Sequence, residues 1–123
     1  VSNQSMTPVI GSWNLVIRPI FQDKQNTIQI PYREILTFSS RLHYVDILTA
    51  DNLFCQYTTL GKIMDNLPDY FIRCHRSHII NMQHIYKISR SSIYLSNNTH
   101  IAIGRSYLDM TRNAFLKYSE RLA

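Results

Sequence analysis

Residues 71–81 read FIRCHRSHIIN, and this stretch indicates the fold class. Its first half alternates the apolar Ile72 and Cys74 with charged or polar neighbours. This is the two-residue period of a β-strand with one apolar and one wet face. The alternation stops at Arg76. We therefore predict a strand over residues 70–76, with the arginine side chain projecting from the end of the sheet.

Similar short runs of strand-forming residues, separated by turn residues, lie on both sides of this strand. They predict a mostly β domain built from short antiparallel strands. Pro19 would restrict the first run to a sheet edge or a bulge. The predicted strands cover residues 13–21, 27–31, 34–39, 42–49, 53–57, 84–89, 93–95 and 100–103, with turns at 23–26, 40–41, 51–52 and 96–99.

Two segments have a helical period instead. Between residues 60 and 67 the apolar side chains fall at i, i+3, i+4 and i+7, which predicts a short helix capped by Thr58 or Thr59. After Gly104 the pattern is helical again, and Ser106 with an acidic residue three positions later has the spacing of a capping box. A short middle helix and a C-terminal helix thus complete the expected fold.

The positive charge of the chain is segregated. Its 13 Lys and Arg residues outnumber its 8 Asp and Glu residues and give a net charge of +5. Residues 70–108 contain no carboxylate, and outside them basic and acidic residues are equal in number. A field of one sign over about a third of the chain is typical of proteins that bind a polyanion. Nucleic acid is therefore the first expected partner.

Length and composition limit the other classes of protein. A chain of 123 residues with 45% apolar residues is expected to fold as one domain. It has neither an apolar run long enough for a membrane span nor a signal peptide, and its 2 cysteines favour a reducing cytoplasm over a disulfide scaffold. Residues 1–10 resemble the end of a linker and residues 11–123 form the expected domain. Val1 at the start indicates a fragment of a longer protein.

Three positions are candidates for contact with DNA. The guanidinium of Arg76 can bind a guanine edge or a phosphate with two hydrogen bonds. Arg105 follows Gly104 where a strand meets a helix, and the free N–H groups of a helix start favour anions. Each is more often an ordinary surface arginine when taken alone, but their shared acid-free region favours a common role. His43 and Tyr44 could reach a base or a phosphate, although packing on a neighbouring strand is the favoured explanation of that pair when it is taken alone.

Metal binding and catalysis have little support. Cys74, His75, His78 and His84 cluster in sequence, but successive strand residues face opposite ways and no second pair completes a tetrahedral set. Cys74 fits a small core residue better than a nucleophile. The carboxylates are scattered, and only 3 glycines leave little room for a phosphate-binding loop. We expect no metal, no cofactor and no catalytic residue.

The run FIRCHRSHIIN, followed by IAIGRSYL at residues 101–108, resembles the LytTR DNA-binding domain, the output half of many bacterial response regulators. The similarity extends over roughly residues 26–118. It implies short antiparallel sheets stacked along an elongated domain, with loops that enter successive major grooves of promoter DNA. It also implies a second copy on repeated half-sites. The receiver or other regulatory domain of such proteins is expected to lie outside this chain.

Carried over by motif, the resemblance implies base contacts from His43, Arg76 and Arg105. Some family members have asparagine at the position of Arg76, and arginine there shifts the expected preference from adenine towards guanine or phosphate. The expected contacts to the DNA backbone are Arg41, Tyr44, Lys62, Arg73, His75, Ser77, Lys87, Arg90, Ser106 and Tyr107.

One alternative keeps the same basic face but gives it another partner. A protein-interaction module would use this face to bind an acidic protein. A salt-dependent pull-down from nuclease-treated extract would distinguish an acidic protein from nucleic acid.

Overall fold

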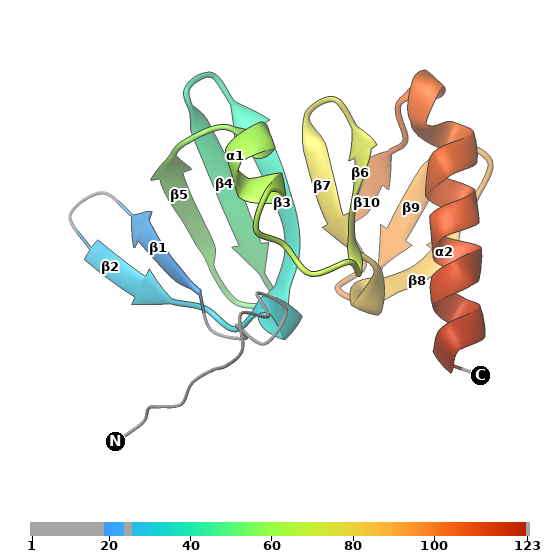
Figure 1. The fold of residues 1–123 in the computed structure, drawn as a ribbon, viewed down its shortest axis with the longest axis horizontal. Coiled ribbons are helices and arrows are strands. Elements are labelled where there is room, and N and C mark those ends of the chain that lie inside the picture. The colour runs from blue at the N-terminus through green and yellow to red at the C-terminus, as the bar shows by residue number, and fades with distance from the viewer. Residues whose placement is uncertain (1–18, 24–25, 123) are drawn as a thin grey trace.

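The computed structural model describes residues 19–23 and 26–122, and Figure 1 shows their arrangement. The strands are β1 (Ile20–Asp23), β2 (Asn26–Gln29), β3 (Ile35–Arg41), β4 (Tyr44–Thr49), β5 (Leu53–Tyr57), β6 (Phe71–His75), β7 (His78–Asn81), β8 (Ile85–Ile88), β9 (Ser92–Leu95) and β10 (His100–Ala102). The helices are α1 (Leu60–Met64) and α2 (Leu108–Leu122), with 3-10 turns η2 (Tyr32–Glu34), η3 (Met82–His84) and η4 (Arg105–Tyr107). The expected linker at 1–10 and most of the strand expected at 13–21 lie outside the described residues.

The described strands form antiparallel sheets, which confirms the predicted mostly β fold. A five-stranded sheet has the order β5-β4-β3-β7-β6, a three-stranded sheet the order β10-β9-β8, and β1 pairs with β2. In Figure 1 the sheets stand side by side along the longest axis, with α1 in front of the five-stranded sheet and α2 beside the three-stranded sheet. Neither helix of the described ranges has the length and apolar content that crossing a membrane requires.

The five-stranded sheet is buried on both faces at β3, β7 and β6. Phe38 and Phe71 lie in one core with residues of β1, β2 and α1, and their ring centroids are 5.7 Å apart. Cys74 and Ile80 lie in a second core with residues of the three-stranded sheet. The prediction that Cys74 is a core residue is confirmed. Arg73 and His75, on the expected wet face of β6, are only partly exposed. The apolar Ile72 and Cys74 are the residues of this strand that pack towards the three-stranded sheet.

Strand pairing changes the predicted strands at two places. Residues 40–41 form the end of β3 and not a turn, because Arg41 pairs with Tyr44 and the Ser40 N–H donates to the Ser77 carbonyl over 2.9 Å. The turn lies instead at residues 42–43. Residues 78–81, for which no strand was predicted, form β7 in the interior of the sheet. An interior strand covered on both faces is apolar without alternation, so a search for period two misses it.

The predicted helix start is right for α1 and wrong for α2. Thr59 caps α1, since its Oγ1 accepts a hydrogen bond from the Lys62 N–H over 3.2 Å. The helix is shorter than predicted and ends at Met64. The expected capping box at Ser106 is absent, because η4 precedes α2 and places Ser106 inside the turn. Gly104 precedes η4 without a side-chain capping bond.

Asn81 ties the five-stranded sheet to the segment that leads into it. Its side chain is fully buried, and its Nδ2 donates to the carbonyls of Ile35 over 2.8 Å and Tyr32 over 3.3 Å. Its Oδ1 accepts from the Gln83 N–H over 2.8 Å. One amide thus satisfies three backbone groups at the point where β7 ends and η3 begins, and it fixes the lower end of the sheet.

Candidate nucleic-acid interface

Three loops lie along one side of the molecule, and we call them the rim: residues 42–43 between β3 and β4, residues 76–77 between β6 and β7, and η4. The bond from Ser40 to Ser77 joins the first loop region to the second. The Gly104 N–H donates to the Cys74 carbonyl over 2.9 Å and joins η4 to β6. Figure 1 shows all three loops on the upper side of the view. The structure therefore brings His43, Arg76 and Arg105 to the same side of the fold.

Side chains of β6 stabilise the turn that carries Arg76 by hydrogen bonds to its backbone. Arg73 donates from Nε to the His75 carbonyl over 3.3 Å and from an Nη to the Arg76 carbonyl over 2.6 Å. The Nδ1 of His75 accepts from the Ser77 N–H over 3.0 Å. Since these bonds fix the backbone while the Arg76 side chain stays exposed, the turn presents its arginine on a stable support. Phosphate contacts by Arg73 and His75 remain predictions, but both side chains already have a structural role.

Gly104 allows η4 to lie close against β6. A Cβ at this position would lie 2.9 Å from Cδ2 of Tyr107 and 3.4 Å from Cα of His75. A larger residue would therefore first displace the ring of Tyr107 within η4, since the distances from that Cβ to β6 are those of ordinary van der Waals contact. The close approach leaves Arg105 and Ser106 exposed beside the β6–β7 turn, while Tyr107 packs partly into the second core.

An aromatic group supports the β3–β4 turn. The ring of Tyr57 lies 6.3 Å from that of His43 and 5.4 Å from that of Tyr44, measured between centroids. Tyr57 is 72% exposed. Tyr57 was not among the predicted contacts, because its place at the rim follows from the pairing of Tyr44 with Tyr57 across β4 and β5. The one signal in the sequence is a tyrosine at the end of the strand predicted over residues 53–57.

Of the residues predicted to contact the DNA backbone, one already pairs with a carboxylate of the protein and another lies on α1, away from the rim loops. Arg41 holds Asp46 with two hydrogen bonds of 3.0 Å, which raises the pKa of Arg41 and compensates the carboxylate. Lys62 lies on α1, in front of the sheet in Figure 1. Contacts of both residues with DNA remain predictions.

Lys87 and Arg90 belong to the three-stranded sheet. Lys87 places its Nζ 4.5 Å from the centroid of the Tyr94 ring. Arg90 lies in the β8–β9 turn, and its carbonyl accepts from Arg112 over 2.6 Å. The neighbouring Ser91 carbonyl accepts from the Ile103 N–H over 2.9 Å, which places this turn next to the start of η4. Arg90 therefore lies near η4 and outside the three rim loops.

The residues weighed as metal ligands have other partners. Nδ1 of His78 lies 2.9 Å from Oγ of Ser39, and burial, followed by the charge of His75, lowers the pKa of His78. Burial raises the pKa of the Cys74 thiol to about 12, so it stays protonated and unreactive. Within residues 19–23 and 26–122, no group of three or more His, Cys, Asp or Glu side chains could hold a metal ion.

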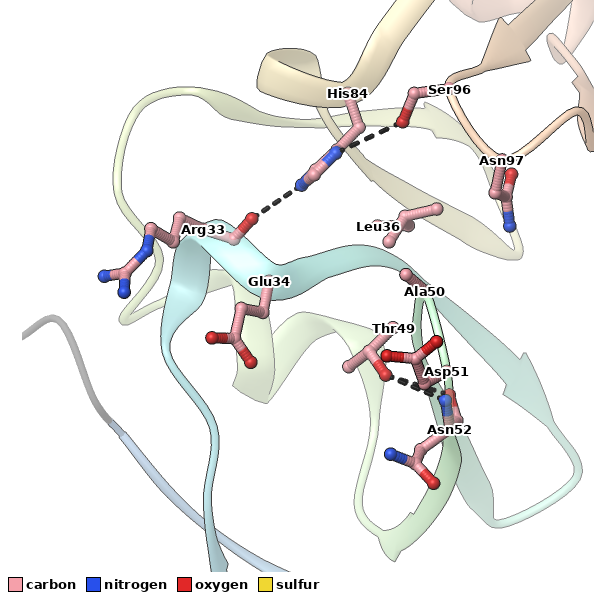
Figure 2. Close-up of a pocket in the computed structure, with 10 residues that line it drawn as sticks. All are labelled: Arg33, Glu34, Leu36, Thr49, Ala50, Asp51, Asn52, His84, Ser96 and Asn97. Carbon is pink, nitrogen blue, oxygen red and sulfur yellow. Dashed lines mark hydrogen bonds between the residues drawn. The ribbon is translucent and has the colours of Figure 1, made fainter.

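A cavity of about 440 Å³ lies at the opposite end of the five-stranded sheet (Figure 2). The β4 strand runs from the rim at Tyr44 to this cavity at Thr49. His84 spans part of it, with Nε2 2.6 Å from the Arg33 carbonyl and Nδ1 3.4 Å from Oγ of Ser96. Its lining mixes both charges with amides, in contrast to the acid-free stretch that supplies most of the rim. The cavity is therefore separate from the candidate DNA surface.

Comparison with known proteins identifies the family and the fold. The family model described as the LytTr DNA-binding domain matches residues 25–115. A solved structure described as the LytTr DNA-binding domain of a methyl-accepting/DNA response regulator from Bacillus cereus has a similar fold, with a TM-score of 0.70 and 22% identity over 79% of this chain and 94% of that chain. No curated protein matches the sequence. The matched family is a non-catalytic one, and its model covers most of the chain. This chain belongs to the LytTR DNA-binding domain family.

Proposed function

We propose that the rim binds specific promoter DNA through successive major grooves and regulates bacterial transcription as the output part of a response regulator. Membership of the LytTR family implies DNA as the partner. The observation that carries the finer proposal is that the three rim loops lie on the same side of the molecule and that backbone hydrogen bonds connect the neighbouring segments. Arg76 and Arg105 supply two-pronged donors, and His43 a third donor, on this side.

In the proposed mode of binding, rim residues contact the bases and residues of the three-stranded sheet contact the phosphates. Arg76, Arg105 and His43 read base edges, since guanidinium and imidazole groups match the donors and acceptors of the major groove. Lys87 and Arg90, both on the three-stranded sheet, bind phosphates beside the base contacts and set the register of the protein. Two copies bind repeated half-sites, and a receiver or other regulatory domain outside this chain controls their action in the cytoplasm.

Selection from a pool of random duplexes tests this proposal. A specific DNA-binding domain will recover a common sequence motif, and protection mapping of a duplex that contains the motif will show repeated half-sites. Recovery of random sequences, together with capture of an acidic protein from nuclease-treated extract, would instead support a protein-interaction module and contradict the proposal.

Binding is expected to depend strongly on salt. If roughly five phosphates are neutralised, the logarithm of the association constant falls with a slope of about −4 to −5 against the logarithm of the salt concentration. Fluorescence anisotropy of a labelled duplex between low and physiological salt measures this slope. A slope near zero would contradict a surface that binds phosphates.

Alanine at Lys87 is expected to weaken specific and scrambled duplexes by the same factor. A phosphate contact carries no sequence information, so its loss also makes the salt slope less steep by about one unit. The same titrations on both duplexes measure this effect. Lys117→Ala on the exposed side of α2 is the matched control, and it should change neither affinity nor slope. A loss confined to the specific duplex would assign Lys87 to base reading.

A further inference from the structure

Leu42 occupies the tip of the β3–β4 turn in an unusual state. It is the first residue of a two-residue turn, because Arg41 and Tyr44 pair on either side of it. Its φ angle is 58°, and its side chain is 91% exposed. The chain therefore places a large apolar side chain in solvent on the side of the molecule where the candidate DNA contacts lie.

Neither the positive φ angle of Leu42 nor the exposure of its side chain stabilises the folded state. A positive φ at the first position of a two-residue hairpin turn favours glycine, since a Cβ clashes with the backbone there. Asn98, with a φ of 71°, is the other such non-glycine residue in the described chain, and asparagine tolerates this conformation. An exposed leucine also gains nothing from burial. Strain without a packing benefit points to a function outside the folded chain.

We propose that Leu42 is a specificity residue that contacts the C5-methyl group of a thymine in the major groove. This inference rests on the proposed function of the rim. A leucine side chain has no hydrogen-bond donor or acceptor, so it gains nothing from a phosphate or a polar base edge. The thymine methyl is the apolar group that the major groove offers, and apolar side chains recognise it. The adjacent His43 would hydrogen-bond while Leu42 packs against the methyl.

The support for the tip fits this role. Arg41 is held by Asp46 on one side of the turn, and Tyr44 packs against Tyr57 on the other. The backbone under Leu42 is thus fixed by an ion pair and by an aromatic contact. A fixed tip loses little conformational freedom on binding, so the small gain from one methyl group is not offset by ordering of the turn.

Deoxyuridine substitution tests the contact directly. Each thymine of the selected site is replaced in turn by deoxyuridine, which removes the methyl group and nothing else. For the unmodified protein, one position should lower affinity by about three- to fourfold, the effect of burying one methyl-sized group. With Leu42→Ala, that same substitution should have no effect, while the other positions respond as before. Leu53→Ala, which removes a leucine 63% exposed on β5, is the matched control and should keep the full penalty.

Leu42→Gly separates the contact from the fold. Glycine removes the strain, so this variant should melt a few degrees above Leu42→Ala while showing the same loss of response to deoxyuridine. If the deoxyuridine penalty persists in both variants, or if no thymine position shows one in the unmodified protein, the inference about Leu42 is wrong and the proposed function stands. If the unmodified protein binds all duplexes equally, the proposed function fails and the inference fails with it.

Discussion

Alanine at both Arg76 and Arg105 is expected to remove most of the sequence preference of the domain. Each arginine that binds a base with two hydrogen bonds contributes about 1–3 kcal/mol of discrimination, so each single variant should lose that amount. The double variant should lose roughly 2–6 kcal/mol on the specific site if the two contacts are independent. Affinity for a scrambled duplex should fall much less. Anisotropy titrations of both duplexes at one fixed salt concentration measure the difference.

The control for this pair is another arginine with equal charge and a different position. Arg33 is exposed beside the cavity at the opposite end of the sheet, and its side chain is outside the rim. Arg33→Ala therefore removes the same charge without removing a proposed base contact, and it should keep the specific preference. Unchanged specific binding by both Arg76→Ala and Arg105→Ala would overturn their assignment as base-reading residues.

Aspartate at Asn81 is expected to lower the free energy of unfolding by about 3–5 kcal/mol at pH 7, because it buries a charge and removes a donor. The amide nitrogen of Asn81 serves the carbonyls of Ile35 and Tyr32, and a carboxylate placed there repels both. The expected loss is larger than that of any exposed substitution in the chain. Urea denaturation followed by circular dichroism measures it.

The loss from Asn81→Asp should depend on pH. Burial raises the pKa of the new carboxyl above its unfolded value of about 3.9, and the neutral acid can donate a hydrogen bond. The destabilisation is therefore smallest below pH 4 and grows as the pH rises from the unfolded towards the folded pKa. Asn113→Asp on the exposed side of α2 makes the same chemical change without burial, and its stability relative to the unmodified protein should vary little with pH. Equal stability of the two variants at pH 7 would contradict the structural role of Asn81.

The periodicity of the sequence predicts most of the fold, and its failures have physical reasons. Alternation and turn residues identify the strands that have one exposed face, together with the turns at 51–52 and 96–99. They miss β7, because a strand covered on both faces shows no alternation. They also place a turn at residues 40–41, where Ser40 and Arg41 resemble turn formers. A contact with Ser77, distant in sequence, makes those residues part of β3.

The distribution of charge in the sequence predicts the basic residues of the candidate site. It does not predict the residues whose role depends on contacts in the folded structure. The acid-free stretch identifies Arg76 and Arg105, and the structure brings them to one rim. The same stretch does not show that Arg73 holds a turn, since that role requires the positions of two carbonyl groups. Tyr57 joins the rim by strand pairing alone. Leu42 looks like an ordinary strand residue until its φ angle is known.

Because Arg73 bonds to the backbone of the β6–β7 turn, one residue stabilises the turn and another, at position 76, supplies the exposed side chain. The turn backbone is fastened by a side chain that is not at its tip, so the residue at position 76 can be exchanged without changing the path of the chain. A substitution at position 76 therefore changes the chemical group that the turn presents and leaves the support of the turn intact. The scaffold needs no compensating mutation for such an exchange.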